Sequence, residues 1–131
     1  MDQKMKDILD RGIYGAPEIK SEERSLFLTT IIERIYIALT KKQVFKKGTY
    51  PEVITKMKTK PNAHLYINND LSYPHYSNYI QEASKLGIRY TIVNPQQDTP
   101  IGLVLAHESQ AVDEKEIFIK DDLYEKDFKE E

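Results

Sequence analysis

Short strand-like segments alternate with helix-like segments along most of this sequence. This alternation constrains the possible folds more than any other feature. The run that ends at Thr40 is dense in β-branched and aromatic residues, and residues 63–69 and 88–93 are also typical of strands. One helix-like segment separates each consecutive pair. Strands that are joined through a single helix run in the same direction with right-handed crossovers. We therefore predict an α/β fold, an α+β sandwich with the order β-α-β-α-β-β and a mixed four-stranded sheet.

The two connecting helices share an entry signal, which is Thr or Ser followed by Tyr-Pro. Thr49 and Glu52 have the spacing of a capping box, in which each side chain bonds the backbone N–H of the other residue. We expect the first helix to begin at Thr49 and to stop before Pro61, because the residue before a proline disfavours helical conformation. Ser72 is the expected N-cap of the second helix, which Gly87 closes.

The first 40 residues predict helices and a loop ahead of the first strand. Apolar residues at helical spacing predict a short helix in residues 1–12, whereas residues 13–20 contain Gly and Pro and are typical of a loop. Ser21 is the expected N-cap of a brief helix that runs to about Leu28. The latter half of residues 29–40 predicts a buried strand, and its first half either joins the strand or extends the helix.

The remainder of the chain predicts a fourth strand and an acidic end. Residues 101–106 form an unbroken apolar run, which indicates burial on both faces of a sheet. Residues 116–119 are a candidate edge strand, and residues 121–131 either form an amphipathic turn or fray. Because the 131 residues contain no linker-like tract, we expect one domain, residues 1–131, with a common core.

The net charge of −2 hides a strong asymmetry along the chain. Residues 41–60 hold seven lysines and one acid, whereas residues 108–131 hold ten acids and four lysines. We hypothesise that the acidic C-terminal segment, residues 113–131, folds over the basic loop of residues 41–48 and competes with its ligand.

The predicted topology gives a location for that ligand. In open α/β sheets, ligands bind beyond the carboxyl ends of the parallel strands. The loops expected there carry lysines and amides, which together with helix N-termini suit an anion such as a phosphate or a carboxylate. The candidate ligand-binding residues are Lys41, Lys42, Gln43, Lys46, Lys47, Asn68, Asn69, Asn94 and Gln96. The sequence therefore predicts a binding module with an anion-accepting site at the C-terminal edge of the sheet.

The common catalytic signatures are absent from the sequence. It contains no P-loop, dinucleotide-binding, zinc-protease or nucleophile-elbow motif, and with no Cys it has no thiolate. His64, His75 and His107 do not fall at helical metal-ligand spacing, so we expect no metal, cofactor or catalytic residue. No window approaches the roughly 18 apolar residues of a membrane span, and we expect a cytoplasmic protein without membrane partners.

Several short motifs together resemble the YueI-like family of small Firmicute (Bacillus) proteins. The matching motifs are Tyr14-Gly15-Ala16-Pro17-Glu18, Glu22-Glu23-Arg24, Glu33-Arg34-Ile35, Ala38-Leu39-Thr40, Gln43-Val44, Gly102-Leu103-Val104 and Ala111-Val112-Asp113. Their order and the chain length match across nearly the whole sequence. The resemblance implies a compact fold similar to Bacillus chorismate mutase, and it brings no activity, cofactor or catalytic residue with it.

Three functions remain open at this point. The first is RNA binding, with the lysines of residues 41–47 and Gln43 meeting backbone phosphates. The second is a small-molecule site at an interface between copies of the chain, where arginines clamp carboxylates. The third is a regulatory or protein-interaction domain that uses exposed tyrosines and the acidic tail.

Overall fold

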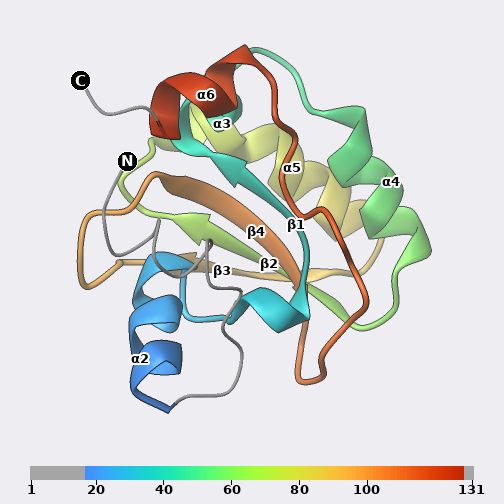
Figure 1. Cartoon of the computed structure of the whole chain (residues 1–131). Coiled ribbons are helices and arrows are strands. Elements are labelled where there is room, and N and C mark those ends of the chain that lie inside the picture. The colour runs from blue at the N-terminus through green and yellow to red at the C-terminus, as the bar shows by residue number, and fades with distance from the viewer. Residues whose placement is uncertain (1–16, 129–131) are drawn as a thin grey trace.

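The computed structural model describes residues 17–128 and contains one mixed four-stranded sheet with helices on both faces (Figure 1). The elements are α2 (Pro17–Leu26), η1 (Ile32–Arg34), β1 (Ile35–Thr40), α3 (Lys41–Phe45), α4 (Pro51–Thr59), β2 (Ala63–Asn68), α5 (Tyr73–Lys85), β3 (Arg89–Val93), β4 (Ile101–His107) and α6 (Asp122–Phe128). No helix within the described range is both long and apolar enough to cross a membrane.

The strand order is β1-β4-β2-β3, and it confirms the predicted mixed sheet. β2 and β3 pair in parallel, whereas β4 lies between β1 and β2 and is antiparallel to both. β1, β2 and β3 therefore run in one direction, as predicted for strands that are joined through helices. Their carboxyl ends meet at one edge of the sheet, where the N-terminal end of β4 also lies.

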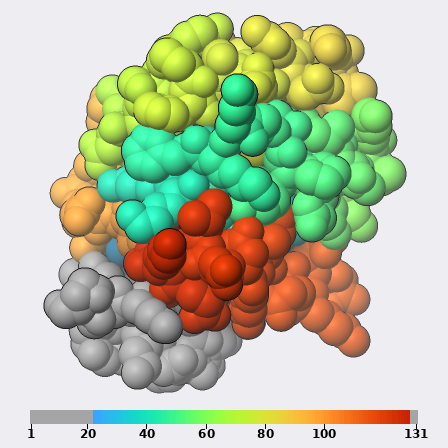
Figure 2. All heavy atoms as spheres, turned by 90° about the horizontal axis from the view of Figure 1, so that it is seen from above, coloured from blue at the N-terminus to red at the C-terminus, as the bar shows by residue number. Residues whose placement is uncertain are grey.

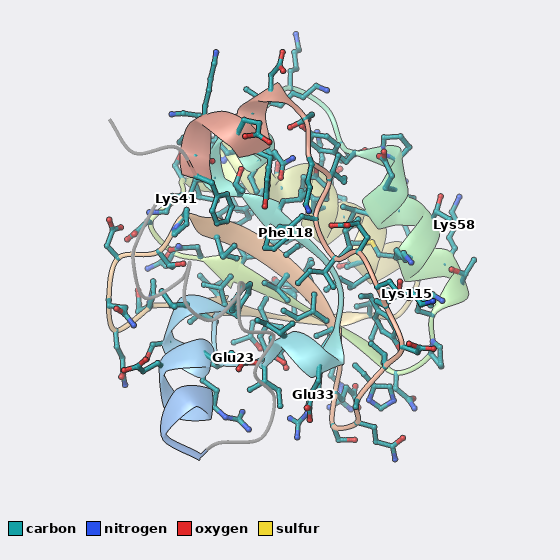
Figure 3. The ribbon with its side chains drawn as sticks, viewed as in Figure 1. Glu23, Glu33, Lys41, Lys58, Lys115 and Phe118 are labelled. Carbon is teal, nitrogen blue, oxygen red and sulfur yellow. The ribbon has the colours of Figure 1, made fainter. Side chains whose placement is uncertain are left out.

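The two faces of the sheet carry separate layers of the core. α4 and α5 cover one face through Val53, Met57, Tyr79 and Ala83, which pack on Leu65 and other inward residues of the strands. The end of α2 and the C-terminal segment cover the β1–β4 half of the other face. The residues of this second layer include Leu26, Phe27, Ala38, Val104, Phe118 and Phe128. Figure 3 shows Phe118 between α6 and the sheet.

The structure has a helix, α3, where the sequence predicts an irregular basic loop at residues 41–48, so that prediction is wrong. The Gln43 side chain accepts a hydrogen bond from the backbone N–H of Thr40 (2.9 Å), so Thr-x-x-Gln caps this helix. The helix also lies close to β4, because a Cβ atom on Gly102 would approach the Lys41 Cα within 3.0 Å.

α4 begins two residues later than predicted, at Pro51. Tyr50, not Thr49, is its N-cap residue, and the Tyr50 N–H donates to the Tyr79 hydroxyl (2.9 Å). The predicted capping box of Thr49 and Glu52 is therefore wrong. α5 follows the prediction closely, since Ser72 is its N-cap residue and Gly87 takes a φ of +72° directly after its C-cap.

The N-terminal predictions need two corrections. α2 begins at Pro17, so Ser21 lies inside the helix and residues 17–20 are not a loop. Residues 29–34 neither extend that helix nor join the strand, because they form a turn and the 3₁₀ helix η1. The Glu23 carboxylate accepts from the N–H of Ile32 (2.6 Å) and so fixes this turn. The helix predicted in residues 1–12 lies outside the described residues.

The C-terminal segment folds along the free edge of β1. The N–H of Ala38 donates to the carbonyl of Ile117 (2.7 Å), and Ala38 and Phe118 form a single parallel bridge. The predicted edge strand at residues 116–119 is thus reduced to one bridge. α6 then packs against α3, and Figure 2 shows the two segments in direct contact.

Candidate functional site

The loops that follow β1, β2 and β3 meet at the C-terminal edge of the sheet. The Lys41 ammonium lies 3.2 Å from the Asp70 carboxylate and 3.3 Å from the Asp98 carboxylate. The Asn69 amide donates to the Asn94 side-chain oxygen (2.7 Å). These contacts join three loops that are far apart in sequence, so Lys41, Asn69 and Asn94 of the predicted residues lie together at this edge.

Two of the four predicted lysines are paired with acids of the protein itself. Lys41 lies between Asp70 and Asp98, and the Lys42 ammonium lies 3.9 Å from Asp127 of α6. Asp127 also accepts from the backbone N–H of Lys42 (2.7 Å). A ligand anion at either lysine would therefore compete with a carboxylate that is already in place.

The other two lysines are exposed and form no ion pair within residues 17–128. Lys46 places its ammonium 4.7 Å from the centre of the Tyr50 ring, a cation–π distance. Lys47 is exposed on the loop after α3. Both follow the last residue of α3, Phe45.

Gln43 and Asn68 are fully buried, and their amides form hydrogen bonds with other groups of the protein. Gln43 donates to the carbonyl of Ile119 (2.7 Å) and to Asp121 (3.0 Å). Asn68 donates to the carbonyl of Ile101 (3.0 Å) and accepts from the N–H of Asp70 (2.8 Å). These amides hold the loops through bonds within the protein, and their role in binding a ligand stays a prediction.

A pocket of about 310 Å³ opens at the carboxyl end of β3, between the end of α2 and the loop that follows β3. Its polar lining consists of Arg24, Ser25, Thr29, Asn94 and Gln96. Asn94 and Gln96 were predicted as site residues. Arg24 was missed, because no local pattern separates it from any other arginine in the last turn of a helix.

Arg24 is the charged group of this pocket. Its guanidinium is exposed, donates to the carbonyl of Thr29 (3.2 Å) and forms no ion pair with any residue from 17 to 128. The same turn holds Leu28 and Thr29 at φ values of +56° and +80°. A β-branched residue is strained in this left-handed region, and such strain is often found where a loop is held for function.

The three histidines lie apart and have separate partners. The His75 ring lies 2.9 Å from the Ser72 hydroxyl, and the His107 ring accepts the N–H groups of Ser109 and Gln110 (both 3.0 Å). Over residues 17–128, no group of three or more potential ligands is placed to hold a metal ion.

The fold and its pocket define the class: a small α+β protein with a mixed four-stranded sheet and a polar pocket at the sheet edge. Residues 2–118 match a family model described as "Protein of unknown function (DUF1694)", and the chain belongs to this family.

The chain is 43% identical over 124 residues to "Uncharacterized protein YueI" of Bacillus subtilis (strain 168), which covers 94% of this chain and 93% of that protein. It is also similar to the crystal structure of the YueI protein from Bacillus subtilis, with a TM-score of 0.84 at 42% identity, covering 96% of this chain and 98% of that one. The resemblance to the YueI-like family is thus confirmed, while the likeness to Bacillus chorismate mutase stays a prediction.

Proposed function

We propose that this protein is a binding module for a small anion, a phosphate or a carboxylate, which it holds in the pocket at the carboxyl end of β3. The observation that carries the proposal is an arginine without an ion-pair partner in residues 17–128, beside two side-chain amides in a pocket of about 310 Å³. The pocket lies at the C-terminal edge of the parallel strands, where open α/β sheets bind their ligands.

The chemistry of the lining suits recognition of an oxyanion. A guanidinium presents a planar set of donors that can bond two oxygens of one phosphate or carboxylate. The Asn94 and Gln96 amides supply further donors around it. Lys41 and Lys42 are not part of this arrangement, because their carboxylate partners already satisfy them.

The same lining favours binding over catalysis. Among its described residues the pocket has no carboxylate, imidazole, ammonium or phenol that could exchange a proton with a ligand. The described part of the acidic C-terminal segment, residues 113–128, packs on α3 through α6 and contributes no residue to the pocket. The hypothesis that this segment competes with a ligand therefore concerns α3 and not the pocket.

Thermal unfolding in the presence of anions tests the proposal. The panel consists of inorganic phosphate, pyrophosphate, AMP and citrate, each at matched ionic strength. A ligand at tenfold its Kd stabilises the fold by about 1.4 kcal/mol. For a chain of this size that free energy raises the Tm by about 5 °C.

The Arg24→Gln variant removes the charge and keeps an unbranched polar side chain. We expect it to unfold at nearly the wild-type Tm without ligand and to lose the ligand-induced rise. Lys58→Gln is the matched control, because Lys58 is exposed on the outer side of α4 (Figure 3). Equal rises for wild type and Arg24→Gln, or no rise with any anion of the panel, would contradict the proposal.

A further inference from the structure

Half of one sheet face carries polar and aromatic side chains that no other element of residues 17–128 covers. The strand registers place His64 and Tyr66 of β2 beside Arg89 and Thr91 of β3 on the face that also carries Val104 and Ala106. Val104 and Ala106 are fully buried under the second core layer. In contrast, His64 and Tyr66 are half-buried and Arg89 and Thr91 are exposed.

The two aromatic rings form a small platform on this face. Their centres are 4.6 Å apart and their planes meet at 38°. The His64 ring nitrogen Nε2 lies 2.7 Å from the Thr91 hydroxyl, which fixes the orientation of the ring. Burial lowers the pKa of His64 below its usual 6.5 and Arg89 lowers it further, against the opposite effect of Glu108. The ring is therefore mainly neutral at physiological pH.

Three arginines surround the platform, and none of them forms an ion pair within residues 17–128. Arg34 approaches from η1, Arg24 from α2 and Arg89 from β3. The Nε atom of Arg34 is buried and has no hydrogen-bond partner. Burial raises the pKa of Tyr66 while Arg34 and Arg24 lower it, so both guanidinium charges act on its hydroxyl.

We propose that this face, formed by Arg24, Arg34, His64, Tyr66, Arg89 and Thr91, binds single-stranded nucleic acid. Bases can stack on the Tyr66 and His64 rings while backbone phosphates meet the arginines, a combination that single-strand binders use. Charge complementarity favours this occupant: an apolar or neutral protein segment would leave the three guanidinium groups without partners, whereas the phosphates of a nucleic acid pair with them. Glu108 is the acid near the rings, and it is exposed to water.

This inference extends beyond the anion pocket and depends on different residues. Arg24 alone belongs to both sites, so the tests use Arg34 and Tyr66, which do not line the pocket. A failure here leaves the response of the pocket to phosphate unchanged, and the two proposals can fail separately.

Fluorescence anisotropy with labelled oligonucleotides of about 12 residues tests the platform. One arm uses oligo-U RNA and the other uses oligo-dT DNA, each at several salt concentrations. With three phosphate contacts, the slope of log K against log salt concentration is about −2 for a single strand. Tighter binding of the RNA would identify the 2′-hydroxyl as part of the recognised ligand, and equal binding would identify the backbone and bases alone.

Substitutions then locate the site. Tyr66→Leu should weaken binding by about fivefold or more through lost stacking, while Tyr66→Phe retains the ring and should bind like wild type. Arg34→Gln should weaken binding and reduce the salt slope by about 0.7. The matched controls are Tyr90→Leu, because Tyr90 is 44% exposed on the opposite face of β3, and Lys58→Gln on α4.

Three results would overturn the proposal. One is the absence of an anisotropy change up to about 100 μM protein at low salt, where even non-specific binding is measurable. Another is an equal loss of affinity in the Tyr66→Leu and Tyr90→Leu variants. The third is loss of binding on charge reversal of Lys46 and Lys47 while Arg34→Gln binds normally, which would move the site to the loop after α3.

Discussion

At the scale of single residues, Tyr50 and Asp121 form the tightest polar contact between the C-terminal segment and the body of the protein. The Tyr50 hydroxyl donates to the Asp121 carboxylate at 2.6 Å. Burial tends to raise the pKa of Asp121, but hydrogen bonds from Tyr50, the N–H of Tyr124 and Gln43 bring it below its ordinary value. Burial and the Asp121 contact both raise the pKa of Tyr50.

We predict that Tyr50→Phe destabilises the protein by about 1–3 kcal/mol, the range for removing one hydrogen bond to a half-buried charged group. Urea unfolding at neutral pH measures this loss. Tyr73→Phe is a suitable control because Tyr73 is 58% exposed and its hydroxyl has no partner within residues 17–128. A Tyr50→Phe variant as stable as wild type would show that the contact contributes nothing.

At the scale of elements, α3 depends on contacts from distant parts of the chain. Five residues are too few for a stable isolated helix. The side chains of Gln43 and Asp127 stabilise its first turn. The Asp127 carboxylate accepts from the N–H of Lys42, although the two residues are 85 positions apart in sequence. Asp127 thus acts as an N-terminal cap that another helix supplies.

Asp127→Ala should therefore cost about 0.5–2 kcal/mol, the usual range for loss of a capping side chain. The Lys42 amide should also exchange its proton with solvent faster, which hydrogen exchange measures at that one residue. Glu125→Gln on the same helix is the control, because Glu125 is exposed. Unchanged exchange at Lys42 would argue against the cap.

The same dependence explains which elements the sequence could predict. β1, β2, β3, β4 and α5 follow from apolar periodicity and from their own turn residues, and all five were predicted within one or two residues. α3 was not, because its lysines resemble a solvated loop and its stabilising partners come from β4 and α6. η1 was missed for a similar reason, since the Glu23 carboxylate that fixes the turn before it belongs to α2.

At the scale of the whole molecule, ion pairs between the basic stretch and the acidic segment neutralise part of the charge asymmetry along the chain. Glu114 of the acidic segment contacts the Lys56 ammonium at 2.8 Å and the Lys60 ammonium at 3.2 Å, both on the basic stretch. Burial tends to raise the pKa of Glu114, but hydrogen bonds from these lysines lower it below its ordinary value of 4.5. The segment is thus tied to α4 as well as to α3.

A carboxylate whose pKa is lower in the folded state contributes stability above its unfolded pKa and loses it as the pH falls. We therefore predict that wild type loses stability between pH of about 5 and about 3, and that Glu114→Gln flattens this decline while lowering the stability at neutral pH. Thermal unfolding across this pH range measures both effects. A Glu114→Gln variant with the acid profile of wild type would contradict the prediction.

The sequence predicts where the candidate site lies, but it predicts only some of the residues that line the pocket. Topology alone places the loops after β1, β2 and β3 at one edge, and Asn94 and Gln96 do line the pocket there. The pairing of Lys41 with Asp70 and Asp98 depends on residues 29 and 57 positions away, which local patterns do not reveal. Arg24 enters the site only because the turn at Leu28 and Thr29 folds α2 toward β3.

An amide-resolved NMR titration of the wild-type protein with inorganic phosphate tests the proposed pocket most directly. We predict that the signals of Ser25, Thr29, Asn94 and Gln96 move together along one saturating curve. Shifts confined to Lys46 and Lys47, or no shifts up to about 50 mM phosphate, which would saturate a site with a millimolar Kd, would contradict it.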